Sequence, residues 1–180
     1  MNIYIALIRG INVSGQKKIL MTDLKELLKG IGLKDVVTYI QSGNIIFSSE
    51  KMTIDILENE IKEKIKDHYG FDVPVLVLSK ESVVQIVEET PFDKLLEGEK
   101  ERVYYTLLKN APSKELVAIL DAHDYEGEKF YITEKCVYFT SLHGYGRAKC
   151  NNNFFEKKLK VSATTRNLKT MMKLIKLASN

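Results

Sequence analysis

Short β-rich segments alternate with amphipathic helical segments along this chain, and their order limits the folds open to it. In the first part the order is strand, helix, strand, strand, helix, strand, over residues 2–8, 22–30, 35–40, 44–48, 53–69 and 73–78. The second helix carries an apolar stripe at three- and four-residue spacing, formed by Ile54, Leu57, Ile61 and Ile65. Gly70 then favours a helix end and Pro74 a strand start.

After Ser79 a similar order begins again. It predicts a helix at 80–89, a polar loop from Pro91 to Lys100, a strand at 102–109, a helix at 113–122, strands at 128–132 and 136–140, and helices at 152–159 and 168–178. The second part thus repeats β-α-β-β-α without an obvious closing strand. We predict an α+β fold of two ferredoxin-like βαββαβ-type halves with mainly antiparallel sheets, packed as one compact unit with basic C-terminal helices. The predicted halves are residues 1–79 and 80–180.

Composition indicates a folded protein outside the membrane. Hydrophobic residues make up 44% of the 180 residues, enough for a core, and no apolar run approaches the ~18 residues of a membrane span. No basic segment precedes the first strand, so we expect a cytoplasmic protein. Cys136 and Cys150 do not form a CxxC pair, which argues against a disulfide framework or a zinc ribbon.

Charge is distributed unevenly along the chain. Residues 145–180 contain nine basic residues and one acidic residue, Glu156, whereas the preceding residues contain 18 basic and 23 acidic residues. A basic segment of this kind favours an anionic partner, although basic helices often form nothing more than a solvated face.

The stretch RGINVSG, residues 9–15, leaves the first predicted strand. Gly10 and Gly15 permit positive φ and close approach of a ligand to the backbone, and the Arg9 guanidinium suits a phosphate or a carboxylate. The alternative is an ordered loop in which Asn12 binds nearby backbone and Arg9 meets a carboxylate elsewhere. No Walker or Rossmann pattern is present.

Two further polar stretches, QSGN and TTRN, contain candidate ligand-binding residues. QSGN predicts a two-residue hairpin turn at Ser42-Gly43, with the amides of Gln41 and Asn44 on either side of it. TTRN precedes the last helix, where Thr165 or Asn167 is a good N-cap, and Arg166 beside that helix end could also bind an anion.

Other chemistry has weaker support. Asp121, His123 and Asp124 include metal-ligand types but lack a partner cluster, so no metal site is predicted. His143 and Cys150 would form a dyad only if the fold happened to bring them together. The strand aromatics, such as Tyr104 and Tyr138, suit cross-strand packing, and no RRM-type motif accompanies them.

The combination of YIALIRGINVSGQKKILMTDLKELL, TYIQSGNIIF and GRAKCNNNFFEKKLKVSATTRN resembles DUF1697, a widespread family of bacterial proteins of unknown function. The resemblance covers nearly the whole chain and implies two ferredoxin-like halves, but no reaction. Ser14 stands where the family usually has Gly, and Leu168 where it usually has Trp. The resemblance also implies that the polar residues of these motifs share one cleft: Arg9, Asn12, Gln41, Ser42, Asn44, Lys149, Asn152, Thr164, Thr165, Arg166 and Asn167.

Three functions compete at this point. The first is binding of an anionic ligand, either a nucleotide-like metabolite or single-stranded RNA, through Arg9, Lys149 and Arg166, with no cofactor. The second is a phosphate-processing enzyme, in which Arg9 and Asn44 take phosphate-binding and water-orienting roles by analogy with acylphosphatase. The third is a protein-interaction module whose basic C-terminal helices dock an acidic partner.

Overall fold

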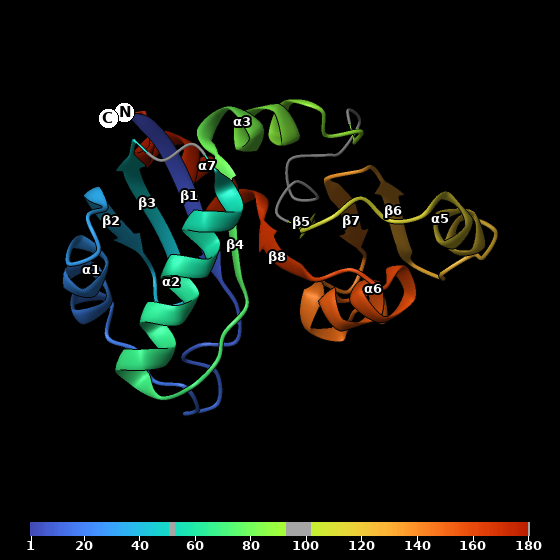
Figure 1. Ribbon diagram of the computed structural model, residues 1–180. Helices are drawn as coiled ribbons and strands as arrows, with labels where there is room; N and C mark the ends of the chain where they lie inside the picture. Colours follow the sequence, from blue (N-terminus) through green and yellow to red (C-terminus); the bar gives the residue numbers. More distant parts are fainter. Residues whose placement is uncertain (51–52, 93–101, 180) are drawn as a thin grey trace. The chain divides into compact units, whose positions relative to one another are not determined.

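The computed structural model describes residues 1–50, 53–92 and 102–179, and these form two compact units (Figure 1). Unit 1 comprises Met1–Val84 with Lys173–Asn180, and unit 2 comprises Gln85–Met172. Two helices, α3 (Lys80–Glu88) and α7 (Leu168–Leu177), each begin in one unit and end in the other. The chain therefore leaves unit 1 through α3 and returns to it through α7.

Unit 1 has the predicted β-α-β-β-α-β order. Its elements are β1 (Asn2–Ile8), α1 (Met21–Lys29), β2 (Lys34–Tyr39), β3 (Asn44–Ser49), α2 (Ile54–Tyr69) and β4 (Val75–Ser79). The strands form one antiparallel sheet, sheet 1, in the order β2-β3-β1-β4. This topology is ferredoxin-like, and its end strands β2 and β4 form the two sheet edges.

The core of unit 1 lies between this sheet and its two helices. The predicted stripe of α2 is confirmed, because Leu57, Ile61 and Ile65 are completely buried in the core cluster. Gly70 ends the helix as predicted, at a φ of 77°, with its N–H bonded to the Lys66 carbonyl at 2.8 Å. Burial of each such aliphatic side chain stabilises the fold by roughly 1.5–3 kcal/mol.

Unit 2 repeats this architecture. Its elements are β5 (Val103–Leu108), α5 (Lys114–Asp121), β6 (Glu128–Ile132), β7 (Cys136–Ser141), the 3₁₀ helix η1 (Tyr145–Arg147), α6 (Asn152–Leu159) and β8 (Ala163–Asn167). Its strands form sheet 2 in the order β6-β7-β5-β8, which matches the order of sheet 1 strand for strand. Its core is rich in aromatic side chains, among which Phe139 and Phe155 are fully buried.

Two local predictions were wrong. The second half does have a closing strand, because ATTRN forms β8 and pairs with β5, where the sequence had suggested a helix cap alone. The β2–β3 connection has four residues instead of two, since Tyr39 pairs with Asn44 and residues 40–43 form the turn. Most of the predicted loop from Pro91 to Lys100 lies outside the described residues.

Each unit protects one sheet edge with a glutamate. The Val77 N–H of β4 donates to Glu58 Oε1 of α2 at 2.9 Å, and the Ala163 N–H of β8 donates to Glu156 Oε1 of α6 at 2.9 Å. Glu58 is buried, so its carboxylate takes the place of water as the acceptor for the N–H group at this strand edge. The shared device supports the duplicated architecture, although the two halves lack an obvious sequence repeat.

Within the described parts of the chain, none of the helices is long and apolar enough to span a lipid bilayer.

Candidate functional site

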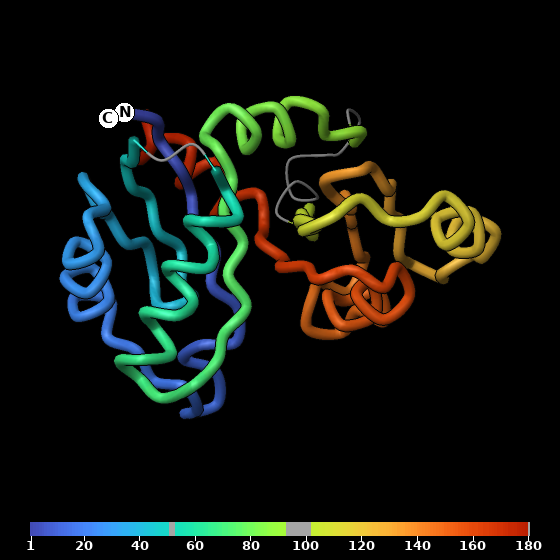
Figure 2. Tube along the Cα trace, viewed as in Figure 1, coloured from blue at the N-terminus to red at the C-terminus, as the bar shows by residue number. Residues whose placement is uncertain are grey.

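The RGINVSG loop and the β2–β3 turn meet at one end of sheet 1. The Asn12 Nδ2 group donates to the carbonyls of Ile19 and Gln41, both at 2.9 Å, and Asn12 Oδ1 accepts the Ile19 N–H at 2.9 Å. Figure 2 shows this loop at the end of unit 1 opposite the N-terminus. Asn12 therefore closes its own loop and ties it to the turn, as the structural interpretation of this residue predicted.

Asn44 is committed to the same turn. It is fully buried, and its Nδ2 donates to the Tyr39 carbonyl at 3.0 Å and to Ser42 Oγ at 2.8 Å. Both amide hydrogens are thus used within the turn, and the water-orienting role that the acylphosphatase analogy would give this side chain stays a prediction. Arg9 is half-buried, and its backbone N–H donates to the Pro74 carbonyl at 3.0 Å.

The side chains of TTRN are split between the two faces of sheet 2, because TTRN is part of a strand. Thr165 shares the helix-facing side with Thr106, and their Oγ1 atoms lie 2.8 Å apart. Arg166 points to the other side with Thr164, whose Oγ1 accepts from the guanidinium at 3.0 Å. Burial lowers the pKa of the Arg166 guanidinium to about 10, while electrostatic interaction with nearby Tyr145 opposes this change.

Asn152 joins the helix-facing polar group of unit 2. Its Oδ1 accepts from Thr165 Oγ1 at 3.0 Å, and its backbone N–H donates to the Tyr145 hydroxyl at 3.0 Å. Asn167 caps α7 by accepting the Thr170 N–H at 2.9 Å, as predicted. Each unit thus collects its own share of the predicted site residues, and the prediction that both shares form one cleft stays a prediction.

The Lys149 backbone is held by an acid that sequence reasoning missed. The Glu128 carboxylate accepts the N–H groups of Lys149 and Cys150, each at 2.7 Å. These amides are therefore occupied by the protein's own carboxylate. The signal was in the sequence: Glu128 shares one strand face with Phe130 and Ile132, so an acid stands where an apolar residue is expected.

A cavity of about 240 Å³ opens beside Glu128 in unit 2, and we call it the Ser141 pocket. The polar and aromatic residues that line it include Arg102, Asp124, Tyr125, Glu128, Lys129 and Ser141. Ser141 is 2% exposed, and its Oγ lacks a hydrogen-bond partner among the residues described. The Arg102 Nη1 donates to the Leu142 carbonyl at 2.7 Å, which fixes the guanidinium against the pocket wall.

Thiol and metal chemistry find little support in unit 2. Burial and the neighbouring Glu128 carboxylate raise the pKa of Cys150 to about 12, and burial also raises the pKa of Cys136. Both thiols therefore stay protonated at neutral pH and are poor nucleophiles. Among residues 1–50, 53–92 and 102–179, three or more His, Cys, Asp or Glu side chains do not gather into a cluster that could hold a metal ion.

The fold and the pocket define a duplicated ferredoxin-like protein whose second unit contains a small cavity with charged and polar residues in its lining. The chain belongs to the family described as "Protein of unknown function (DUF1697)", whose model matches residues 1–138. This confirms the family to which the motifs pointed.

The chain also has the fold of the conserved bacterial protein SP0830 from Streptococcus pneumoniae, with a TM-score of 0.71 and 24% sequence identity. The match covers 98% of each chain, in agreement with the predicted fold class. No curated protein matches the chain.

Proposed function

We propose that unit 2 binds a small anionic metabolite in the Ser141 pocket. The observation that carries this proposal is the Ser141 hydroxyl, which is buried without a partner among the described residues and belongs to the pocket lining. Such a group costs about 1–3 kcal/mol when it stays unsatisfied. A ligand that supplies the missing hydrogen bond recovers that free energy.

Two cationic side chains of the pocket lining can bind an anion. Arg102 keeps further N–H groups for a ligand after its bond to the Leu142 carbonyl, and a guanidinium binds carboxylate or phosphate in two-point fashion. Lys129 adds a second cation. Two acids, Asp124 and Glu128, also line the pocket, and the backbone N–H groups of Lys149 and Cys150 stabilise the Glu128 carboxylate where it stands.

The size of the cavity favours a metabolite over a macromolecule. Drug-sized ligands occupy pockets of about 300–1,000 Å³, and the Ser141 pocket is smaller than this range at about 240 Å³. Its ligand would also touch Glu128, which holds the amides of Lys149 and Cys150. Occupation of the pocket would thereby act on the segment that contains Lys149, one of the residues through which the sequence predicts anion binding.

The test is thermal denaturation and calorimetric titration with inorganic phosphate, nucleoside monophosphates, dicarboxylates and short RNA. We expect stabilisation by a small anion. Ser141→Ala should leave the free energy of unfolding unchanged or raise it, because an unpaired hydroxyl disappears, while it weakens ligand binding roughly tenfold. Arg102→Ala should abolish binding, and Arg147→Ala, which removes an exposed arginine of the same unit, should not.

Other results would refute the proposal. Loss of stability in Ser141→Ala would mean that the hydroxyl has a structural partner. Loss of binding in Arg9→Ala or Arg166→Ala, with Arg102→Ala unaffected, would favour the site suggested by the sequence motifs. Binding of RNA alone, with affinity falling by orders of magnitude between about 50 and 200 mM salt, would indicate a nucleic-acid surface.

A further inference from the structure

The strand β2 is an open edge of sheet 1. It pairs with β3 on one side, and no side chain in the described part of the chain is hydrogen-bonded to the backbone of residues 34–38 on the other. The opposite edge differs, since Glu58 satisfies the Val77 N–H of β4. An open edge presents unpaired N–H and C=O groups in the geometry that another strand requires.

Apolar side chains at this edge also reach solvent. Val37 is 38% exposed, and Ile40, in the turn that follows β2, is 50% exposed. A bulge at Asp35, whose φ is 52°, interrupts the ladder between Lys34 and Val37. The bulge limits regular pairing to the part of β2 after Val36, so a short strand fits this edge better than a long one.

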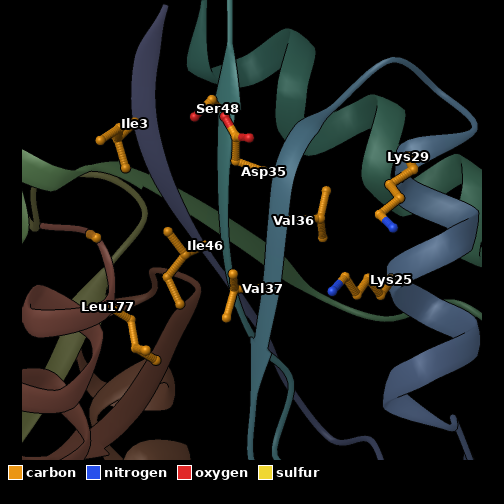
Figure 3. A pocket seen from close by; sticks show the side chains of 10 residues that line it. Ile3, Lys25, Lys29, Asp35, Val36, Val37, Ile46, Ser48 and Leu177 are labelled. Carbon is orange, nitrogen blue, oxygen red and sulfur yellow. The ribbon is translucent and has the colours of Figure 1, made fainter. Parts of the chain in front are cut away.

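A groove of about 760 Å³ surrounds this edge, and we call it the β2 groove. Figure 3 shows β2 running along it, with Lys25 and Lys29 of α1 on one side and Val37, Ile46 and Leu177 on the other. One wall thus carries the two lysines and the other is mainly apolar, while Asp35 and Ser48 line the groove further along. All of these residues belong to unit 1.

The two walls suit the two faces of an added strand, whose side chains alternate between them. Successive side chains of a strand point to opposite faces, so one set would reach the lysines while the other set packs on the apolar wall. Lys25 has no ion pair among the described residues, and the contact of Lys29 with Glu26, 2.7 Å long, is a solvent-exposed pair of small energy. Both ammonium groups can therefore bind the carboxylates of a ligand.

We infer that β2 binds an extended peptide segment in which acidic and apolar residues alternate, and that the peptide joins sheet 1 as a fifth strand. Main-chain hydrogen bonds to β2 supply affinity, and the two walls supply specificity. A second copy of the chain is a poorer occupant. Antiparallel pairing of two β2 edges, about a two-fold axis perpendicular to the sheet, places both α1 helices on the same face of the joined sheet, so that the lysines of the two copies repel one another.

The experiment is fluorescence anisotropy with labelled seven-residue peptides in which Val alternates with Glu. Controls have Lys in place of Glu, or N-methyl groups on alternate amides, which remove half of the backbone donors. We expect only the acidic, unmethylated peptide to bind. The double variant Lys25→Glu/Lys29→Glu should weaken this binding roughly tenfold and favour the Lys peptide. The matched variant Lys157→Glu/Lys158→Glu, on α6 of unit 2, should leave it unchanged.

Several outcomes would overturn the inference. These are equal binding of the methylated and unmethylated peptides, equal effects of the two charge reversals, or no binding of the acidic peptide at about 1 mM, the weak limit for specific recognition. Sedimentation that shows a dimer lost in Val37→Lys would assign the edge to a second copy instead. Because the Ser141 pocket lies in unit 2, each proposal can fail without the other.

Discussion

The close contact at Gly43 gives a quantitative test of how the β2–β3 turn docks on β1. A Cβ atom at this position would lie 2.8 Å from Ile8 Cβ, 3.0 Å from Ile11 Cδ1 and 3.0 Å from the Ile8 carbonyl oxygen. The residue also has a φ of 76°. Gly43→Ala therefore combines two costs: about 1–2 kcal/mol for the left-handed backbone and about 1–3 kcal/mol for overpacking.

Gly70→Ala is the matched control for this substitution. Gly70 has nearly the same φ, 77°, but a Cβ atom there would meet no heavy atom within 4 Å. The Gly70→Ala variant should therefore lose free energy of unfolding only through the left-handed backbone, by about 1–2 kcal/mol. The effect of alanine on the unfolded chain is common to both variants and cancels in the comparison.

Urea denaturation of the two variants, followed by far-UV circular dichroism, measures the difference. We expect Gly43→Ala to be less stable than Gly70→Ala by about 1–3 kcal/mol, with the same slope against urea concentration. Equal destabilisation of the two variants would refute the reasoning, because it would mean that the turn moves away from Ile8 at no energetic cost. The 2.7 Å bond from the Ile8 N–H to the Gly43 carbonyl would then contribute nothing to the docking.

Two further predictions concern side chains that connect elements of unit 1. Glu58→Ala leaves the Val77 N–H without its acceptor and should destabilise the protein by about 1–3 kcal/mol, whereas Glu58→Gln, which keeps an acceptor oxygen, should lose less; urea denaturation distinguishes them. Asp23 accepts from the Tyr69 hydroxyl at 2.7 Å, and this bond lowers the pKa of Asp23 below 3.8. A carboxyl whose pKa is lower in the folded state than in the unfolded state stabilises the fold at pH values above its unfolded-state pKa. This contribution is therefore present at neutral pH and is lost as the pH falls through the folded-state pKa. Asp23→Asn should accordingly make the urea midpoint less sensitive to pH below about 4, and an unchanged acid response would contradict the assignment.

Periodicity predicted the fold well because it records which face of each element is buried. The stripe of α2 and the stop at Gly70 were both confirmed. The strand β8 escaped notice because its residues, Ala163–Asn167, lack the apolar alternation of a buried strand and also resemble a helix cap. Asn167 does cap α7, so one residue serves both elements.

The polar contacts of the candidate site could be predicted from the sequence only in part. The motifs identified Asn12 and Asn44, but their short polar side chains serve backbone carbonyls, a use that looks the same in sequence as ligand binding. The contact of Glu128 with the Cys150 amide joins residues 22 positions apart, which no local pattern records. Nothing in the sequence around Ser141 indicates that its hydroxyl lies beside a cavity and lacks a hydrogen-bond partner among the described residues.

The path of the chain through α3 and α7 makes unit 2 an insertion within unit 1. During synthesis the four strands of sheet 1 emerge early, but Leu174 and Ala178, both buried residues of unit 1, follow only after all of unit 2 has been made. Unit 1 must therefore close a loop of nearly ninety residues, and the entropic cost of this closure is lower when unit 2 is already folded and its ends are close together. Until then the β2 groove lacks the wall that Leu177 supplies, so ribosomes stalled before residue 173 would carry a nascent chain with this edge at its most aggregation-prone.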